Sequence, residues 1–305
     1  MFYCNKQSKR FSFKNDYPNN LMEMSRIGNL SIIMAQVKNW MRVLFEFALF
    51  SVNLMKGEKE IKIIFKNGDS VLTNSIDTAW SIIAYYHISK KFGVYDRTEM
   101  EEINGLSSYI KCRLEDEFYN GGIREGHPGA NYSFSRTSIG IYCAIRMVKP
   151  EIVIETGVAQ GISTSLFLKA LQHNGLGQLI SIDFPNRDPR GYTYDGVLDH
   201  VYTPKEKEPG WLVPKSLRNL WRLEIGKSSE ILPTLEKCDI FYHDSEHSYN
   251  NMKYEFEWAY SHISKGGIIS SDDITWNNAW TDFLNRHKDL EELLPDLFSA
   301  IAVKK

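Results

Sequence analysis

The second half of the chain alternates short, wholly apolar stretches with amphipathic ones, and this alternation constrains the fold more than any other sequence feature. The apolar stretches predict strands at 151–157, 178–184, 220–226, 238–244, 266–273 and 298–304. The stretches around them predict helices at about 135–147, 162–173, 228–236, 249–264 and 277–288. Such alternation indicates a parallel sheet covered by helices on both faces. We therefore expect a doubly wound, mostly parallel α/β domain, which binds its ligand beyond the carboxyl ends of the strands.

The turn after the first of these strands, in IVIETGVAQGIST (152–164), leaves the backbone accessible to a ligand. Gly157, Ala159 and Gly161 are small, and the helix that follows offers unpaired N–H groups. The next strand ends in Asp183, 22 residues after Gly161, where a carboxylate can accept hydrogen bonds from both hydroxyls of a ribose. Together these features predict a ligand that contains a nucleoside. The segment lacks the second and third glycines of a dinucleotide fingerprint, G-x-G-x-x-G.

Acidic residues follow two later strands at the same edge of the predicted sheet. Asp244 ends one strand, and Asp272 and Asp273 end the next. Carboxylates gathered there would repel one another unless a cation neutralised them, and oxygen ligands suit Mg²⁺ best, with Mn²⁺ or Ca²⁺ as alternatives. His247 lies three residues after Asp244 and can accept a proton near neutral pH. A metal bound to a substrate hydroxyl lowers the pKa of that hydroxyl, so this set predicts activation of an alcohol.

The segment from Glu155 to Gly161 resembles the E/D-x-G-x-G-x-G signature of class I S-adenosylmethionine-dependent methyltransferases, with Ala159 in place of the middle glycine. The resemblance implies a Rossmann-like fold and S-adenosylmethionine as cofactor, with loop 157–163 facing its methionine end and Asp183 its ribose. The residues implied for cofactor binding are Glu155, Gly157, Ala159, Gly161, Ser163, Asp183 and, at the adenine edge, Ser228. The family usually has an acid at that edge, where this chain has Lys227.

The second set resembles the site of macrocin-type O-methyltransferases, which are metal-dependent enzymes acting on sugar hydroxyls. Its members are Asp244, His247, Asp272 and Asp273, with Asp272 28 residues after Asp244. The resemblance implies that the three aspartates bind magnesium and that His247 is the general base. Glu is common in that family where Asp272 stands. A more distant likeness is to catechol-type O-methyltransferases, which have Lys at the position of His247 and Asn at that of Asp273.

These features predict a metal-dependent O-methyltransferase that acts on a hydroxyl of a sugar or of another small-molecule or glycan acceptor. Methyl transfer is an in-line displacement, so the protein must hold the acceptor oxygen behind the methyl carbon. Amines need less activation than alcohols, which disfavours N-methylation. Two alternatives stay open: a nicotinamide-dependent oxidoreductase, which shares the glycine turn and the ribose acid, and a non-catalytic S-adenosylmethionine-binding scaffold.

The resemblance covers about 135–305, and the N-terminal part contains no chemical motif. We expect a helical and hairpin extension at 1–110, acting as a lid or oligomerisation element, and a methyltransferase domain at 111–305. The extension is predicted to hold an amphipathic helix at 29–55, a hairpin at 60–74 turning at Asn67-Gly68, and a helix at 75–93. Ile76, Trp80, Ile83 and Ala84 share one face of the last helix.

Charge and cysteine usage limit which kinds of partner and which cellular compartment are expected. Charges at intervals of four residues interrupt 29–55, so it is not expected to span a membrane. Packing on the protein or on a sister subunit is favoured over binding to a membrane surface. The formal net charge is −2 and no long basic block occurs, so no nucleic-acid partner is expected. Four widely spaced cysteines predict free thiols, and the polar first 16 residues lack a secretory signal, which favours the cytoplasm.

Each candidate residue also has a purely structural interpretation. Asp272 and Asp273 could simply cap the turn before the helix at 277–288, and His247 could be a surface or capping residue. His243 is expected to be a satisfied core residue, and Trp276 and Tyr249 are expected to serve packing. The acceptor is expected to lie between loops 120–136 and 185–219. Four aromatic residues of the second loop could stack on a sugar ring: Tyr192, Tyr194, Tyr202 and Trp211. The penultimate strand of the usual methyltransferase sheet has no candidate in the sequence.

Overall fold

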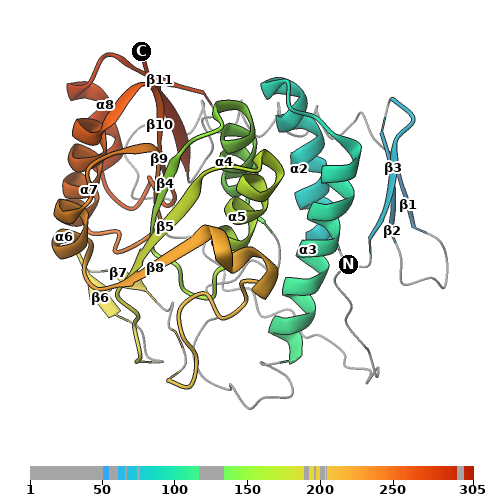
Figure 1. Ribbon diagram of the computed structural model, residues 1–305, viewed down its shortest axis with the longest axis horizontal. Coiled ribbons are helices and arrows are strands. Elements are labelled where there is room, and N and C mark those ends of the chain that lie inside the picture. Colours follow the sequence, from blue (N-terminus) through green and yellow to red (C-terminus); the bar gives the residue numbers. More distant parts are fainter. Residues whose placement is uncertain are drawn as a thin grey trace, which may run out of the picture.

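A seven-stranded sheet forms the centre of the computed structural model (Figure 1). The structure describes residues 51–54, 61–65, 67–73, 76–116, 134–188, 192–195, 197–199, 203, 205–293 and 299–305. The strands of this sheet are β4 (Ile152–Thr156), β5 (Gln178–Asp183), β8 (Trp221–Ile225), β9 (Cys238–His243), β10 (Ile263–Ser271), β11 (Leu290–Glu292) and β12 (Ala300–Lys304). Their spatial order is β11-β12-β10-β9-β4-β5-β8. The antiparallel pairs of this sheet are those that β12 forms with β10 and β11, and the other strand pairs are parallel, so the expected doubly wound, mostly parallel fold is confirmed.

The order in which the chain adds strands to the sheet switches sides between β4 and β9, which are themselves parallel. It runs outward from β4 through β5 to β8 and then returns to place β9 on the other side of β4. In sheets of this kind, ligands bind outside the carboxyl ends of the strands at such a switch. Thr156 pairs with both Ile182 and His243, and Ser271 also pairs with His243. The residues that follow these strands therefore meet at one edge.

Helices cover both faces of the sheet. One face is covered by α6 (Ser228–Ile231), α7 (Tyr249–His262) and α8 (Ala279–Arg286), and the other by α4 (Arg136–Val148) and α5 (Ile162–Asn174) (Figure 1). Adjacent residues of one strand enter different cores: Val153 and Ile240 belong to the core under α4 and α5, whereas Ile154 and Phe241 belong to the core under α7 and α8. This is why apolar residues stand at successive positions in the middle of these strands.

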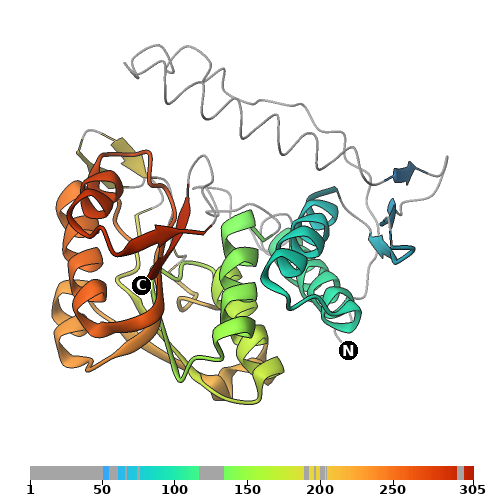
Figure 2. The same cartoon turned by 90° about the horizontal axis from the view of Figure 1, so that it is seen from above.

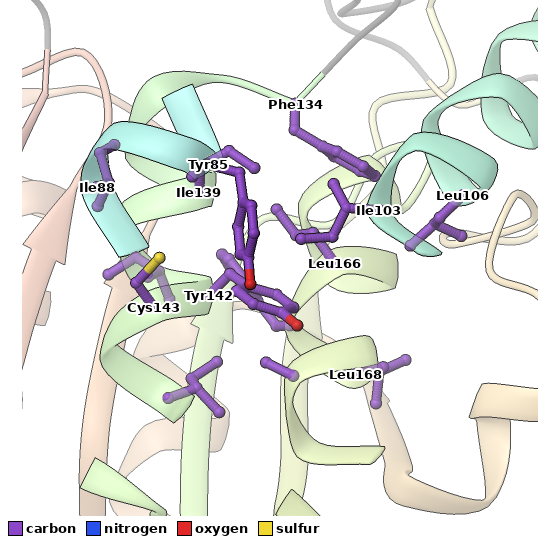
Figure 3. Packing of buried hydrophobic residues seen from close by; sticks show 14 of the residues in the cluster. Tyr85, Ile88, Ile103, Leu106, Phe134, Ile139, Tyr142, Cys143, Leu166 and Leu168 are labelled. Carbon is purple, nitrogen blue, oxygen red and sulfur yellow. The ribbon is translucent and has the colours of Figure 1, made fainter. Parts of the chain in front are cut away.

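The N-terminal helices α2 (Ile76–Phe92) and α3 (Arg97–Glu115) form a further layer outside α4 and α5 (Figure 2). A small antiparallel sheet lies beyond them, made of β1 (Ser51–Leu54), β2 (Ile61–Ile64) and β3 (Ser70–Thr73). Tyr85, Ile103, Tyr142 and Leu166, one from each of the four helices, belong to a single apolar cluster (Figure 3). Helix α3 runs through the predicted boundary at 110, so the division into 1–110 and 111–305 stays a proposal.

Several N-terminal expectations differ from the structure. The hairpin turning at Asn67-Gly68 is confirmed as β2–β3, with Gly68 at a φ of 87°. The predicted helix at 29–55 is wrong at its end, because residues 51–54 form β1 and pair with β2; residues 29–50 lie outside the described residues. Trp80 is 47% exposed, so it does not share the buried face of Ile83. Helix α3 and the three-residue β11, which supplies the missing penultimate strand, were not predicted.

Two further findings concern the cysteines and the membrane. Cys143 and Cys238 are buried free thiols, as expected. Cys112 is disulfide-bonded, so the expectation that all four cysteines are free is wrong. Cysteine usage therefore no longer supports the predicted cytoplasmic location. In the described part of the chain, no helix combines the length and the apolar character needed to cross a bilayer.

Candidate active site

The loop between β4 and α5 lies directly against the loop that follows β9. Gly157 has a φ of 84°, and its N–H donates to the carbonyl of Ile182 at 2.9 Å. A β-carbon at this position would lie 1.8 Å from the carbonyl oxygen of Asp244, so only glycine fits. Gly161 has a φ of 87° and faces the backbone of Gly210. Close backbone contact therefore explains these two glycines, and they bring the turn up to the site of the acids.

Asp183 organises the same loop. Its Oδ2 accepts hydrogen bonds from the N–H groups of Val158, at 2.7 Å, and Ala159, at 2.9 Å. Burial raises the pKa of Asp183, and the two N–H groups oppose that effect. Ala159 has a φ of 45°, an uncommon conformation for a residue other than glycine. The carboxylate that the sequence assigns to the ribose thus holds the turn in place at the mouth of β5.

Glu155 lies beneath the loop and is fully buried. Its carboxylate accepts hydrogen bonds from the hydroxyls of Ser163, Thr164 and Ser181 at 2.7, 2.8 and 2.7 Å. Burial raises the pKa of Glu155 to about 7, although these three hydroxyls act in the opposite direction. Through these hydrogen bonds Glu155 joins β4 to the first turn of α5 and to β5. Its partner Ser163 also lines a cavity.

A cavity of about 100 Å³ connects the turn to the acids. Its lining residues are Ser135, Ser138, Val158, Ala159, Gln160, Ile162, Ser163, Tyr242, Asp244 and Asp272. Ser135 and Ser138 begin α4, where the Ser135 hydroxyl accepts a hydrogen bond from the Ser138 N–H at 3.0 Å. Sequence reasoning missed both serines, although the capping pattern of a serine before the helix at 135–147 was a signal for them.

The structure brings together the three aspartates and the histidine that the sequence singled out. His247 Nε2 lies 3.9 Å from Asp244 Oδ1 and 3.9 Å from Asp273 Oδ2. Asp244 and Asp273 are about one-third exposed, at 33% and 34%. Burial, followed by repulsion from Asp272 and Asp273, raises the pKa of Asp244 well above its ordinary value. The ionised form of Asp244 is therefore disfavoured next to the other two carboxyl groups.

The donor set suits a hard divalent cation. Carboxylate oxygens are the ligands that Mg²⁺ and Ca²⁺ prefer, and a cation beside Asp244 would favour its ionised form over the neighbouring repulsion. Among the residues that the structure describes, no three His, Cys, Asp or Glu side chains are arranged to enclose a metal ion as they stand. The residue types thus fit a metal, but the described arrangement does not form a complete coordination site.

His247 is held by packing. It is 6% exposed, and burial, followed by the effect of His243, lowers its pKa well below the ordinary value. Neither of its ring nitrogens has a hydrogen-bond partner among the described residues. The ring lies 5.0 Å, centroid to centroid, from that of Trp276. Trp276 therefore packs as expected, but it does so against a candidate catalytic group.

The structural alternatives for these residues can be examined directly. The N-cap of α7 is Ser248, and that of α8 is Asn278, so His247 and the two adjacent aspartates cap neither helix. Tyr249 serves packing, since its hydroxyl donates to Asp282 Oδ2 at 2.9 Å. His243 is fully buried as expected, but its Nε2 has no partner within the described residues. His243 is therefore a core residue as expected, but only one of its two ring nitrogens, Nδ1, has a hydrogen-bond partner among the described residues.

The predicted adenine edge lies beyond β8. Ser228 begins α6, and its hydroxyl donates to Asn251 Oδ1 at 3.3 Å. Phe184, directly after Asp183, is 62% exposed. The ammonium group of Lys227 lies 5.7 Å from the centroid of the Phe184 ring. An exposed aromatic ring and a cation thus stand where the family usually has an acid.

Part of the predicted acceptor wall is anchored on the cofactor loop. Trp211 Nε1 donates to Gln160 Oε1, and the Gly210 N–H donates to the Ala159 carbonyl at 2.9 Å. Tyr192 and Tyr194 lie in β6 (Tyr192–Tyr194), which pairs with β7 (Val197–Asp199). The side chains of these two tyrosines, Tyr202 and residues 120–133 lie outside the described residues.

The chain was compared with protein families, curated proteins and solved structures. Residues 154–274 match a family described as "Methyltransferase domain". A comparison with curated proteins gave no significant match. Similar solved structures include the O-methyltransferase NovP, with 17% identity and a TM-score of 0.48 over 68% of this chain and 99% of that one. TomG from Streptomyces achromogenes has 14% identity and a TM-score of 0.44, covering 76% of this chain and 99% of that one. An O-methyltransferase from Bacillus cereus has 13% identity and a TM-score of 0.43, covering 75% of this chain and 100% of that one.

The matched residues contain the glycine turn, Asp183, the switch between β4 and β9, and the acids after β9 and β10. The resemblance inferred from the E-x-G-x-A-x-G segment is confirmed, and the nicotinamide-dependent alternative is set aside. Residues 154–274 are thus similar to a methyltransferase domain, the class of domain that the glycine turn predicted.

Proposed function

We propose that this protein is a metal-dependent O-methyltransferase, which moves the methyl group of S-adenosylmethionine to a hydroxyl of a sugar or of another small-molecule or glycan acceptor. One observation carries the proposal: Asp244 and Asp272 line the same cavity as Val158, Ala159 and Ser163 of the glycine turn. A hydroxyl held by the acids would therefore lie beside a cofactor held by the turn. His247 and Asp273 stand next to Asp244 at the same edge.

The cofactor would extend along the carboxyl ends of three strands. The turn and the N-terminus of α5 would hold its methionine end, with Ser163 on the cavity wall. Asp183 would accept hydrogen bonds from the ribose hydroxyls. Ser228, or the N–H of Lys227, would contact the adenine edge beside Phe184. Glu155 would contribute from beneath, by holding Ser163 and Thr164 through its buried carboxylate.

The acids and the histidine would prepare the acceptor. Asp244, Asp272 and Asp273 would hold a divalent cation, which supplies Lewis acidity to an acceptor hydroxyl. His247 is suited to take the proton, because its lowered pKa keeps the ring uncharged at neutral pH. The acceptor oxygen then forms a bond to the methyl carbon as the carbon–sulfur bond breaks, and S-adenosylhomocysteine leaves. Holding the oxygen in line behind the methyl group is the main contribution of the protein.

The experiment that tests this function has two parts. Calorimetry measures S-adenosylmethionine binding with and without Mg²⁺, and labelled methyl transfer is then screened across glycosides, nucleotide sugars and catechols. We expect cofactor binding in both conditions and transfer that EDTA abolishes and added Mg²⁺ restores. Absence of cofactor binding would end the proposal. Binding without transfer to any acceptor, with or without metal, would favour the alternative of a non-catalytic scaffold.

Three expectations accompany this proposal. Residues 1–110 are proposed to act as a lid or oligomerisation element, and the layer formed by α2 and α3 on α4 and α5 is compatible with either role. A homo-oligomer formed through the N-terminal segment stays a prediction, because residues 29–50 lie outside the described residues. A cytoplasmic location also stays a prediction.

A further inference from the structure

A buried carboxylate lies directly behind the candidate site. Glu255 of α7 is fully buried and accepts hydrogen bonds from Thr156 Oγ1 at 2.6 Å and Ser245 Oγ at 2.8 Å. It also pairs with His243 Nδ1 at 2.6 Å. One side chain therefore joins the last residue of β4, the last residue of β9 and the residue that follows Asp244.

The sequence contains a signal for this group in the pattern of α7. Met252, Phe256 and Ala259 form the apolar stripe of α7, and Glu255 lies on the same buried face. A carboxylate on such a stripe is costly to bury unless it has partners. Asn251 Nδ2 also donates to Glu255 at 3.2 Å, and the Ser228 side chain is a further hydrogen-bond partner. These hydrogen bonds offset the cost of burying the carboxylate and fix its position.

The ring that Glu255 holds packs on the proposed base. The His243 and His247 rings lie 5.1 Å apart, centroid to centroid, and meet edge to face at an interplanar angle of 80°. Within the described residues no hydrogen bond orients the His247 ring, so its direction depends on its ring neighbours. His243 is the neighbour whose own orientation is locked, through Nδ1 and Glu255.

We propose that Glu255 and His243 are a positioning pair for the reaction. Glu255 fixes the His243 ring, and His243 fixes the direction in which the His247 imidazole faces the acceptor hydroxyl. Both members of the pair are 0% exposed, so neither touches a substrate. The inference rests on the proposed role of His247 as base. It gives a positioning role to Glu255, which was not predicted, and to His243, which was expected to be a core residue only.

The test compares two buried carboxylates that each bind a histidine. Glu255→Gln retains the shape of the side chain and removes its charge. Glu99→Gln is the matched control, because Glu99 lies between α3 and α4, away from the cavity, and accepts hydrogen bonds from Tyr142 at 2.7 Å and Arg146 at 3.0 Å. We expect Glu255→Gln to lower kcat about 10- to 100-fold, the usual effect of losing a residue that orients an active group. The Kd for S-adenosylmethionine should change less than about threefold, and Glu99→Gln should leave kcat unchanged.

A second readout keeps the test independent of turnover. Ring nitrogen and carbon NMR signals of His247, assigned with His247→Gln, should shift in Glu255→Gln and stay in place in Glu99→Gln. If the wild type methylates no acceptor, the proposed function fails. The NMR comparison still shows whether Glu255 and His243 orient the His247 ring. Equal kcat in Glu255→Gln and wild type, or unchanged His247 signals, would overturn the proposal. If Glu255→Gln does not fold, Glu255→Asp replaces it, with a smaller loss of kcat expected.

Discussion

The carbonyl oxygen of Asp244 occupies the space in which a β-carbon of residue 157 would lie, at 1.8 Å from that ideal position. Gly157 belongs to the cofactor turn and Asp244 to the acid set, so the two halves of the site are in direct backbone contact. A change on one side must therefore displace the other.

Gly157→Ala should damage both halves at once. The substitution adds a clash with backbone, which cannot rotate away, to the strain of a φ of 84°. We expect a loss of at least about 2 kcal/mol in the free energy of unfolding and no measurable binding of S-adenosylmethionine by calorimetry. Gly175→Ala is the control: its φ is 68° with nothing within 4 Å, so it should cost about 1 kcal/mol and leave binding intact. Normal cofactor affinity in Gly157→Ala would contradict the assigned turn.

Asp183→Asn should weaken cofactor binding. The change removes the charge that accepts two loop N–H groups and, as proposed, the ribose hydroxyls. Hydrogen bonds to charged groups contribute about 1.5–3 kcal/mol, so the calorimetric Kd should rise about 10- to 100-fold. Asp239→Asn is a matched control, because Asp239 Oδ2 accepts the N–H groups of Glu151 and Ile152 at the opposite end of β4. An equal change in Kd for both variants would show a general effect on β4 rather than ribose binding.

Asp244→Asn should abolish turnover and raise the melting temperature in metal-free buffer. The raised pKa of Asp244 means that ionising this group opposes folding at every pH above its unfolded value, so neutralising it relieves repulsion from Asp272 and Asp273. We expect Tm to rise by a few degrees, while the Kd for S-adenosylmethionine stays within several-fold. Glu246→Gln, an exposed change in the same loop, should alter neither. A lower Tm in Asp244→Asn would argue against accumulated negative charge in the cleft.

Glu99 should make stability depend on pH in the acid range. Burial alone would raise its pKa, but hydrogen bonds from His173, Arg146 and Tyr142 lower it to about 2. A lowered pKa contributes stability that is present above the unfolded value of 4.5 and is lost as the pH falls through about 2. The shift corresponds to about 3 kcal/mol. Urea unfolding should show Glu99→Gln less stable by about that amount at pH 7, with the difference shrinking toward pH 2. A difference that is constant with pH would contradict the shifted pKa.

Much of the fold could be predicted because its determinants are local. The apolar runs at β4, β5, β8 and β9 and the helical patterns at α4, α5 and α7 agree with the structure to within a few residues. The meeting of Asp244, Asp272 and the glycine turn also followed from sequence, because the carboxyl ends of parallel strands share one edge of a sheet. The family match over 154–274 agrees with the methyltransferase domain that the turn suggested.

Other elements depend on partners distant in the chain. The residues of β11 are too few for a periodic pattern, and they form a strand only because β12 offers its edge. Residues 51–54 continue an apolar run that is also compatible with a helix, and pairing with β2 makes them β1. Trp80 shares its helical spacing with buried residues and is nevertheless 47% exposed, because α2 packs with another face.

The sequence by itself determined the order of strands and helices, the glycine turn and the positions of the acids that follow the strands. Tertiary structure alone decided that Glu255 holds His243, that His243 packs on His247, and that Asp244 touches Gly157. The physical reason is that periodicity records which face of an element is buried. Hydrogen bonds and ring contacts between elements depend instead on distances and directions that arise only when β4, β9 and α7 pack together.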